Sequence, residues 1–347
     1  MKTALFLLII AAAFLGSALR MFPEDVERKE LLSDYGFFQG DLAKLEPSAD
    51  VFFYDVNTAL FSNYAEKSRF IRLPKGSKIS FRDSTPFEFP VGTILIKNFY
   101  YPKDFRNASL GRTIIETRLL VRKEKGWDAW PYIWNDEQTE ALYDPSGEVR
   151  SVSYLDLKGK KRTTNYAIPN KNQCKGCHVS GKAMMPIGLT ARQLDRHITF
   201  GEGSVGQLHH WLKSGILEGV NDLAKIKRLA VWDDPASGTL DVRARAYLDA
   251  NCGHCHSAGG PASTSGLFLD IFETRPVHLG VNKAPVAAGR GAGNLTYDIV
   301  PGHPEQSILL FRMKTTDPAI AMPEIGREQI HAEGVELIEQ WIRSNQF

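Results

Sequence analysis

The sequence has no long hydrophobic run after its first residues, no run of basic residues and no excess of charge of one sign. Its 347 residues carry a formal net charge of +2. Because nucleic-acid-binding proteins normally cluster their basic residues, this even charge argues against a nucleic-acid partner. A membrane-spanning helix needs about 20 apolar residues, so we expect no membrane span in the mature chain. The hydrophobic fraction of 43% and the charged fraction of 24% are ordinary for a globular protein.

The apolar run at the N-terminus is shorter than such a span. Lys2 precedes the apolar residues 4–16, and Gly16-Ser17-Ala18 is a small-residue cleavage site. This order is typical of a secretory signal peptide. We therefore predict that residues 1–18 are a signal peptide that is removed on export, rather than a retained anchor. No cysteine closely follows the run, so we do not expect a lipoprotein.

Cysteine is scarce, and its placement is the strongest signal in the chain. The four cysteines belong to two copies of a Cys-x-x-Cys-His pattern, which are Cys174, Cys177 and His178, and Cys252, Cys255 and His256. This is the pattern to which c-type haem is attached. Each thiol can form a thioether with a haem vinyl group, and the adjacent histidine can bind the iron. We therefore predict two covalently bound haem c groups, with no cysteine left for a disulfide.

Two other kinds of site use the same residue types. Cys252-Gly253-His254-Cys255 also matches a dithiol oxidoreductase motif, in which a lowered thiol pKa supports disulfide exchange. That fold would place a strand before the motif, whereas a helical pattern precedes Cys252, and it would not require His256. Two Cys-x-x-Cys pairs can also bind zinc. The long separation between Cys177 and Cys252 and the histidine after each pair fit a zinc site poorly.

Residues 19–170 predict a β-rich domain. Three β-branched and aromatic runs indicate strands, and a fourth segment indicates a hairpin, at residues 91–100, 114–122, 127–134 and 149–167. Short strands at this spacing suggest an antiparallel sandwich. Trp130, Tyr132 and Trp134 would share one face of a strand. We interpret them as part of the sandwich core, and the alternative is an aromatic platform for a glycan or a docking partner.

Residues 171–237 form the first predicted haem region, where the second axial ligand stays open. The candidates are Met184, Met185, His209 and His210, or no protein ligand at all. The two methionines follow His178 closely, which makes the opposite haem face hard to reach, and methionines are also common in cores. A helical stripe of apolar residues from 205 to 216 predicts that His209 points inward and that His210 lies off the stripe.

Residues 238–347 form the second predicted haem region. Ala244, Leu248 and Cys252 repeat at intervals of four, which predicts a helix that leads into the motif. A second amphipathic helix is expected at about residues 327–343.

Met322 is the predicted axial ligand opposite His256. It stands in a Met-Pro step before the last predicted helix. A thioether ligand makes the iron six-coordinate and raises its reduction potential. Met313 is the competing candidate.

Several short stretches accompany the two motifs, at residues 57–65 (NTALFSNYA), 116–121 (ETRLLV), 132–135 (YIWN), 243–248 (RARAYL) and 265–267 (SGL). Together they resemble a family of exported bacterial dihaem c-type cytochromes with a β-rich N-terminal region, over roughly residues 31–347. The C-terminal part is also similar to class I cytochrome c, in which the first and last helices cross and pack. The resemblance implies periplasmic electron transfer and supplies no substrate. The doubled Met184-Met185 is not a feature we associate with that family.

The expected fold is α+β multidomain, an N-terminal antiparallel β-sandwich-like domain followed by α-helical cytochrome c-type haem domains. The expected divisions are a signal peptide, a β-rich domain, a first haem region and a class I cytochrome c-like domain, at residues 1–18, 19–170, 171–237 and 238–347. The expected function is electron transfer through two haems to a redox partner protein in the periplasm. The alternatives are a dihaem enzyme with one open iron, such as a peroxidase or a small-molecule dehydrogenase, and a glycan- or surface-binding module with a haem electron outlet.

Overall fold

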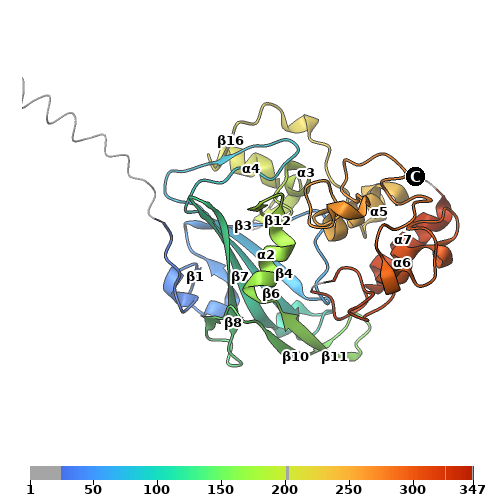
Figure 1. Ribbon diagram of the computed structural model, residues 1–347. Helices are drawn as coiled ribbons and strands as arrows, with labels where there is room; N and C mark the ends of the chain where they lie inside the picture. Colours follow the sequence, from blue (N-terminus) through green and yellow to red (C-terminus); the bar gives the residue numbers. More distant parts are fainter. Residues whose placement is uncertain (1–24, 201–202, 325, 346) are drawn as a thin grey trace, which may run out of the picture.

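The computed structural model describes residues 25–200, 203–324, 326–345 and 347. The predicted signal peptide, residues 1–18, lies outside these residues. The described chain forms a central β-sheet, and the C-terminal helices lie beside it (Figure 1). No helix in the described part of the chain is long and apolar enough to cross a membrane.

A six-stranded antiparallel sheet in the order β3-β4-β6-β7-β8-β9 forms the centre of the molecule. Its strands are β3 (Val51–Tyr54), β4 (Glu66–Arg72), β6 (Ile94–Pro102), β7 (Arg112–Lys123), β8 (Gly126–Trp134) and β9 (Ala141–Tyr143). The three predicted strands are confirmed as β6, β7 and β8. They are neighbours in the sheet because short connections favour antiparallel pairing of consecutive strands.

One face of the sheet packs against the described chain that precedes β3, which contains Tyr35 and Phe37. Trp130, Tyr132 and Trp134 alternate along β8 and are at most 3% exposed. They belong to one apolar cluster with Tyr35 and Phe37. Alternate residues of a strand point to the same face, so this burial confirms the core interpretation. It also means that these three side chains offer no exposed aromatic platform.

Later parts of the chain cover the opposite face. One apolar cluster joins Leu95, Leu120 and Ala129 of the sheet to Cys174 and Trp211. A second cluster joins the sheet to the predicted hairpin, which is formed by β10 (Glu148–Leu155) and β11 (Lys161–Ile168). Helix α2 (Lys171–His178) lies in front of this face (Figure 1) and contacts β8.

The remaining described chain consists mostly of turns and loops, with short helices and strands along it. The first group is β1 (Phe38–Gln39), β2 (Glu46–Pro47), β5 (Ile79–Ser80), β12 (Val179–Ser180), β13 (Ala183–Met184), α3 (Ala191–Leu194), β14 (His197–Phe200), β15 (Gly203–Gly206), α4 (Gln207–Lys213) and β16 (Leu217–Glu218). The C-terminal group is α5 (Leu240–Leu248), the π-helical turn η6 (Asp249–Gly253), α6 (Ile308–Met313) and α7 (Ala332–Ser344). Leu248, Ile338 and Trp341 lie at the centre of the C-terminal apolar core.

The predicted fold class was wrong, because no α-helical cytochrome domains follow the β-rich region in the described chain. Strands dominate the molecule, and the six α-helices of the described chain are short, the longest being α7 with 13 residues. Residues 171–237 and 238–347 therefore do not form α-helical cytochrome domains. Glycine and proline recur between the apolar positions of both regions, and both residues disfavour helix interiors. The N-terminal region is antiparallel, as predicted, and consists of the six-stranded sheet with the small β10–β11 sheet packed on one of its faces.

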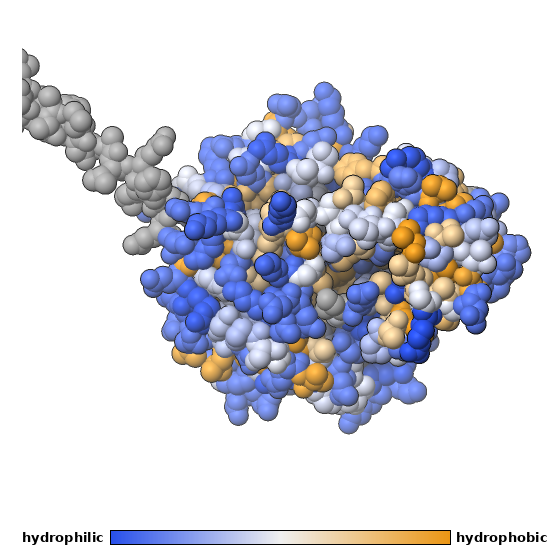
Figure 2. Space-filling view, viewed as in Figure 1, coloured by the Kyte–Doolittle hydropathy of each residue, from blue (hydrophilic) through white to orange (hydrophobic). Residues whose placement is uncertain are grey.

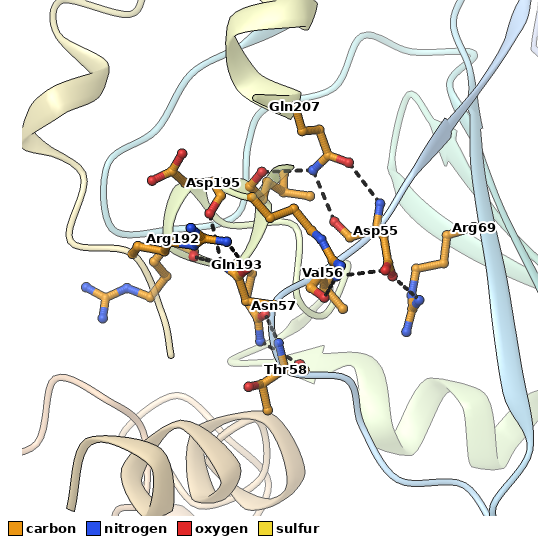
Figure 3. A network of polar contacts seen from close by, with 12 residues as sticks. Asp55, Val56, Asn57, Thr58, Arg69, Arg192, Gln193, Asp195 and Gln207 are labelled. Carbon is orange, nitrogen blue, oxygen red and sulfur yellow. Dashed lines mark hydrogen bonds and ion pairs between the residues drawn. The ribbon is translucent and has the colours of Figure 1, made fainter. Parts of the chain in front are cut away.

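Residues 55–65, here called the connecting segment, link the sheet to the rest of the molecule. The backbone N–H of Asp55 donates to Gln207 Oε1 at 2.9 Å. Asn57 Nδ2 donates to two carbonyl oxygens in and just after α3, at 2.9 and 3.0 Å (Figure 3). Thr58 Oγ1 donates to the carbonyl oxygen of Ala230 at 2.6 Å. These bonds fix the start of the segment against α3 and α4.

The second half of the connecting segment contacts the C-terminal part. The backbone N–H of Phe61 donates to Asn251 Oδ1 at 2.8 Å. Asn63 is fully buried, and its Oδ1 accepts from the backbone N–H groups of Glu328 and Gln329 at 2.7 and 3.1 Å. The segment therefore holds the sheet and the C-terminal helices together through buried polar contacts.

Candidate functional site

Helix α2 places the first Cys-x-x-Cys-His motif on the second face of the sheet. Its N-terminus is fixed by a capping box, in which Asn170 and Gln173 each accept from the other's backbone N–H at 2.9 Å. Cys174 is buried in the cluster of Leu95, Leu120 and Ala129. Cys177 is half-buried. The short helix thus presents one thiol to the core and the other to its edge.

His178 is the last residue of α2, and the following β-hairpin fixes its imidazole. His178 Nδ1 lies 2.8 Å from the carbonyl oxygen of Met185, and the Met185 backbone N–H donates to the His178 carbonyl oxygen at 2.7 Å. Burial lowers the pKa of His178 to about 4, so the ring is neutral at pH 7. In a neutral ring, an Nδ1–H donated to a carbonyl leaves Nε2 with a free lone pair, as a metal-bound histidine requires.

The second motif follows α5 through the π-helical turn η6. Asn251 is buried in this turn, and its Nδ2 donates to the Tyr247 carbonyl oxygen at 2.9 Å. A Cβ added at Gly253 would lie 3.0 Å from the Cα atom of Asp270, and one added at Gly260 only 2.1 Å from the Cys255 carbonyl oxygen. These two glycines let the chain fold closely around the motif.

His256 is the counterpart of His178 in the second motif. Its Nδ1 lies 3.4 Å from Ser265 Oγ. Burial lowers the pKa of His256, and a backbone hydrogen bond to Leu267 opposes this. Ser265 and Leu267 belong to the SGL stretch of the sequence. That stretch therefore orients the second imidazole, as the hairpin after α2 orients the first.

The structure brings the two motifs side by side, although 74 residues separate Cys177 from Cys252 in the sequence. The backbone N–H of Gly181, just after the first motif, donates at 2.7 Å to the carbonyl oxygen of Gly259, just after the second. Electrostatic interaction between Cys255 and Cys177 adds to the effect of burial in raising the pKa of Cys255 to about 11. The sequence did not predict this proximity, because it depends on how the two regions pack.

His254, inside the second motif, lies at this junction. Burial lowers its pKa to about 4, with smaller effects from His256 and Lys97. Its own charge would in turn lower the pKa of His178. His254 Nδ1 is buried without a hydrogen-bond partner. The junction therefore contains an imidazole nitrogen whose bonding capacity the described protein atoms do not satisfy.

The pKa values and the grouping of the thiols bear on the two alternatives to haem, a dithiol oxidoreductase and a zinc site. All four cysteines are free. Burial raises the pKa of Cys174 and Cys177, and it raises the pKa of Cys252 to about 12. Disulfide exchange needs a thiol with a lowered pKa, so these thiols do not suit a dithiol oxidoreductase. Within the described residues, no three His, Cys, Asp or Glu side chains are grouped to hold a metal ion, so the shared zinc site is not formed.

The two methionines proposed for the second iron differ in their surroundings. Met313, at the end of α6, is 5% exposed and belongs to the C-terminal apolar core. Met322 is half-buried, and its backbone N–H donates to the Arg312 carbonyl oxygen at 3.1 Å. Arg312, whose carbonyl oxygen accepts this bond and which precedes Met313 in the chain, and Glu324, two residues after Met322, both affect the pKa of His256. The choice of Met322 as the ligand of the second iron therefore stays a prediction.

The candidate ligands of the first iron also differ in placement. Met184 packs with the cluster that contains Cys174. Met185 is half-buried, and its carbonyl oxygen is within hydrogen-bond distance of His178 Nδ1. His209 is exposed on α4, so the helical stripe predicted for it was wrong. The stripe failed because α4 begins only at Gln207 and buries Leu208 and Trp211. His210 is half-buried on the same helix.

Sequence reasoning missed a group of buried cations beneath the motifs. Arg69, Lys97 and Arg118 lie opposite one another on β4, β6 and β7. A lysine at an inward position of a β-branched and aromatic strand was the available signal, because Lys97 alternates with Leu95 and Phe99. The sequence does not show which face of the strand is covered, so it could not show that Lys97 lies on a covered face.

Comparison with protein-family models, with curated proteins and with solved structures found no match to this chain.

Proposed function

We propose that the protein is a dihaem c-type cytochrome that transfers electrons to or from a redox partner protein in the periplasm. Cys174 and Cys177 would hold one haem, and Cys252 and Cys255 the other. Each bound haem iron would supply a site that accepts and releases one electron. The observation that carries the proposal is the pairing of the two motifs, each with a half-buried histidine whose pKa is lowered and whose Nδ1 is hydrogen-bonded.

The chain's own residues support this role in three ways. The carbonyl oxygen of Met185 and the backbone of Leu267 orient the two histidines, so that Nε2 of each can serve as a ligand. Burial keeps both rings neutral at pH 7. The bond between Gly181 and Gly259 holds the two motifs together, which favours electron exchange between the groups they carry.

The test is to count haems on the full chain, purified from a host that can attach c-type haem. A haem stain of the denatured protein and the pyridine haemochromogen spectrum should give two haems per chain. The variant C174A/C177A should keep one haem, and so should C252A/C255A. A chain without covalent haem from a host that matures a control cytochrome would overturn the proposal.

A second candidate function, a dihaem enzyme, is favoured by the surroundings of the first motif. Met184 packs in an apolar cluster and His209 is exposed. Neither position supports an axial ligand opposite His178, and the first iron would have an open coordination position if Met185 and His210 do not bind it either. Carbon monoxide distinguishes the two functions. A spectral change at one of the two haems would favour the enzyme, and no change would favour the electron carrier.

A further inference from the structure

The covered face of the sheet has an unusual composition near the motifs. Successive rows across β4, β6, β7 and β8 can be read from the strand pairing. The first row is apolar and consists of Ile71, Leu95, Leu120 and Ala129. The next row is Arg69, Lys97, Arg118 and Pro131. Three adjacent strands therefore place cations directly opposite one another, an arrangement that destabilises a sheet unless anions compensate it.

The two outer cations of this row have such anions, and the middle one does not. Arg69 forms an ion pair with Asp55 at 2.6 Å, and Arg118 forms one with Glu116 at 2.5 Å. Among the described residues, no carboxylate lies within ion-pair distance of Lys97. Its ammonium group lies 4.9 Å from the centre of the Phe99 ring. A cation–π contact of this kind contributes only about 0.5–2 kcal/mol.

Lys67 repeats the pattern one row further along. It lies opposite Phe99 and on the same face as Arg69. No ion pair to Lys67 is formed within the described chain either. Burial lowers the pKa of Lys67 to about 7, and it lowers the pKa of Lys97 well below its ordinary value. A lysine that is costly to charge in isolation regains its charge when an anion binds beside it.

The position of Lys97 connects it with both motifs. Leu95, two residues before it on the same face, packs in one cluster with Cys174. Electrostatic interaction with Lys97 affects the pKa of Cys177, His178 and His254. Lys97 therefore lies beneath the junction of the motifs, where the edges of attached groups would meet the sheet. In the view of Figure 2, hydrophobic and weakly polar residues gather in the middle of the molecule, and hydrophilic residues surround them.

We propose that Lys97, with Lys67 beside it, forms a carboxylate-binding site for the propionates of the attached haems. This inference rests on the proposed function. It adds the residues that would bind the propionates at the edge of the haem. A covalently held propionate fits better than a free anion, because the cations face the motifs from within a covered sheet. A propionate would also place a negative charge beside Lys97, the middle cation of the row, for which the described protein side chains provide no ion pair.

The experiment compares K97M with K103M in the full chain. Lys103 follows β6 directly and is exposed, so the control removes the same charge outside the covered face. Loss of a buried positive charge beside a propionate favours the oxidised iron. K97M should therefore lower the midpoint potential of one haem by about 59 mV, a tenfold shift of a one-electron equilibrium. K103M should leave both potentials unchanged, and K97R should restore most of the loss.

A second measurement separates a propionate from a free anion. The potentials are compared in sodium acetate and in sodium chloride at equal ionic strength. A bound propionate predicts the same potentials in both salts, whereas a free carboxylate site predicts a shift with acetate that K97M abolishes.

Four results would decide the question. Haem absent from the wild-type chain would reject the proposed function itself. If both haems are attached and K97M and K103M have equal potentials, only the carboxylate site is rejected. If the potentials shift with acetate, the site binds a free anion and not a haem propionate. If K97M does not fold, K97Q and K97R carry the comparison, and equal potentials in those two variants reject the site.

Discussion

Met322 stays the predicted axial ligand opposite His256, and its surroundings differ from those of Met313. Arg312 binds its backbone and, with Glu324, acts electrostatically on His256. Met313 is instead buried among the apolar side chains of the C-terminal core. The two methionines should therefore respond differently to substitution.

We expect M322A to keep both haems attached and to lower the potential of one, because the thioether ligand would be lost. M313L is the matched control. It conserves volume in the core and should cost less than about 1.5 kcal/mol of stability, without any effect on potential. Redox titration followed in the visible spectrum checks both variants. Unchanged potentials in M322A would refute the ligand assignment, and a lowered potential in M313L would transfer it to Met313.

His331 is a buried residue that no sequence pattern singled out. Its ring stacks on Phe61 of the connecting segment at 4.1 Å between centroids, and its Nδ1 lies 3.0 Å from the Tyr247 hydroxyl. Burial lowers the pKa of His331 to about 4; the charge of Glu333 opposes this to a smaller extent, and the charges of Lys67 and Arg327 add to it. The imidazole ring of His331 is therefore neutral in the folded protein at pH 7.

This burial predicts a loss of stability in acid. The unfolded chain protonates His331 near pH 6.5 and the folded chain only near pH 4. The stabilising contribution is thus complete above pH 6.5 and is lost as the pH falls to 4, by about 3 kcal/mol in total. Urea unfolding at a series of pH values should show a shallower slope in this window for H331F than for wild type. Identical slopes would mean that His331 stays exposed to protons in the folded protein.

At the scale of elements, the closest contact of the C-terminal part is the approach of α5 to α7. A Cβ added at Gly334 would lie 2.3 Å from the Tyr247 hydroxyl oxygen and 2.4 Å from the adjoining ring carbon. Trp341 Nε1 donates to Asp241 Oδ1 at 2.9 Å at the other end of the contact. Only glycine lets the two helices approach this closely.

G334A should therefore destabilise the protein, although alanine favours a helix over glycine. Overpacking a tight contact costs about 1–3 kcal/mol, and helix propensity returns up to about 1 kcal/mol. G176A in α2 is the control, because its added methyl group meets open space. Chemical denaturation should show a loss of about 1–2 kcal/mol for G334A and no loss for G176A. Equal stability of G334A and wild type would show that α5 and α7 can separate without cost.

The same scale shows what the sequence could predict. The alternation of Trp130, Tyr132 and Trp134 identified a strand and its buried face correctly, because that pattern is local. The stripe through His209 failed, because α4 begins only at Gln207 and tertiary packing buries Gln207, Leu208 and Trp211 instead of His209. The cysteine motifs were visible as motifs. Their proximity, the cation row and the contacts of Asn63 depend on residues far apart in the chain, which no local pattern contains.

At the scale of the whole molecule, the connecting segment determines whether the two motifs stay together. The first motif is packed on the sheet, and the second belongs to the C-terminal part. Asn63 joins these parts at a fully buried site, where one amide oxygen accepts two backbone N–H groups. Its backbone φ of 51° is one that asparagine tolerates better than most residues. Loss of this side chain would leave two part-buried backbone donors without this acceptor.

We therefore expect N63A to lower the stability of the protein by about 1–3 kcal/mol, since a fully buried donor left unsatisfied costs about 1–3 kcal/mol and these two part-buried donors each cost less. The loss should be local to the contact between the sheet and the C-terminal part. Calorimetry should then show two unfolding transitions in place of one, and limited proteolysis should release the C-terminal part. N107A, which removes an exposed cap from a surface turn, is the control and should keep one transition. A single unshifted transition in N63A would mean that the bond between Gly181 and Gly259 and the apolar contacts suffice to hold the two motifs side by side.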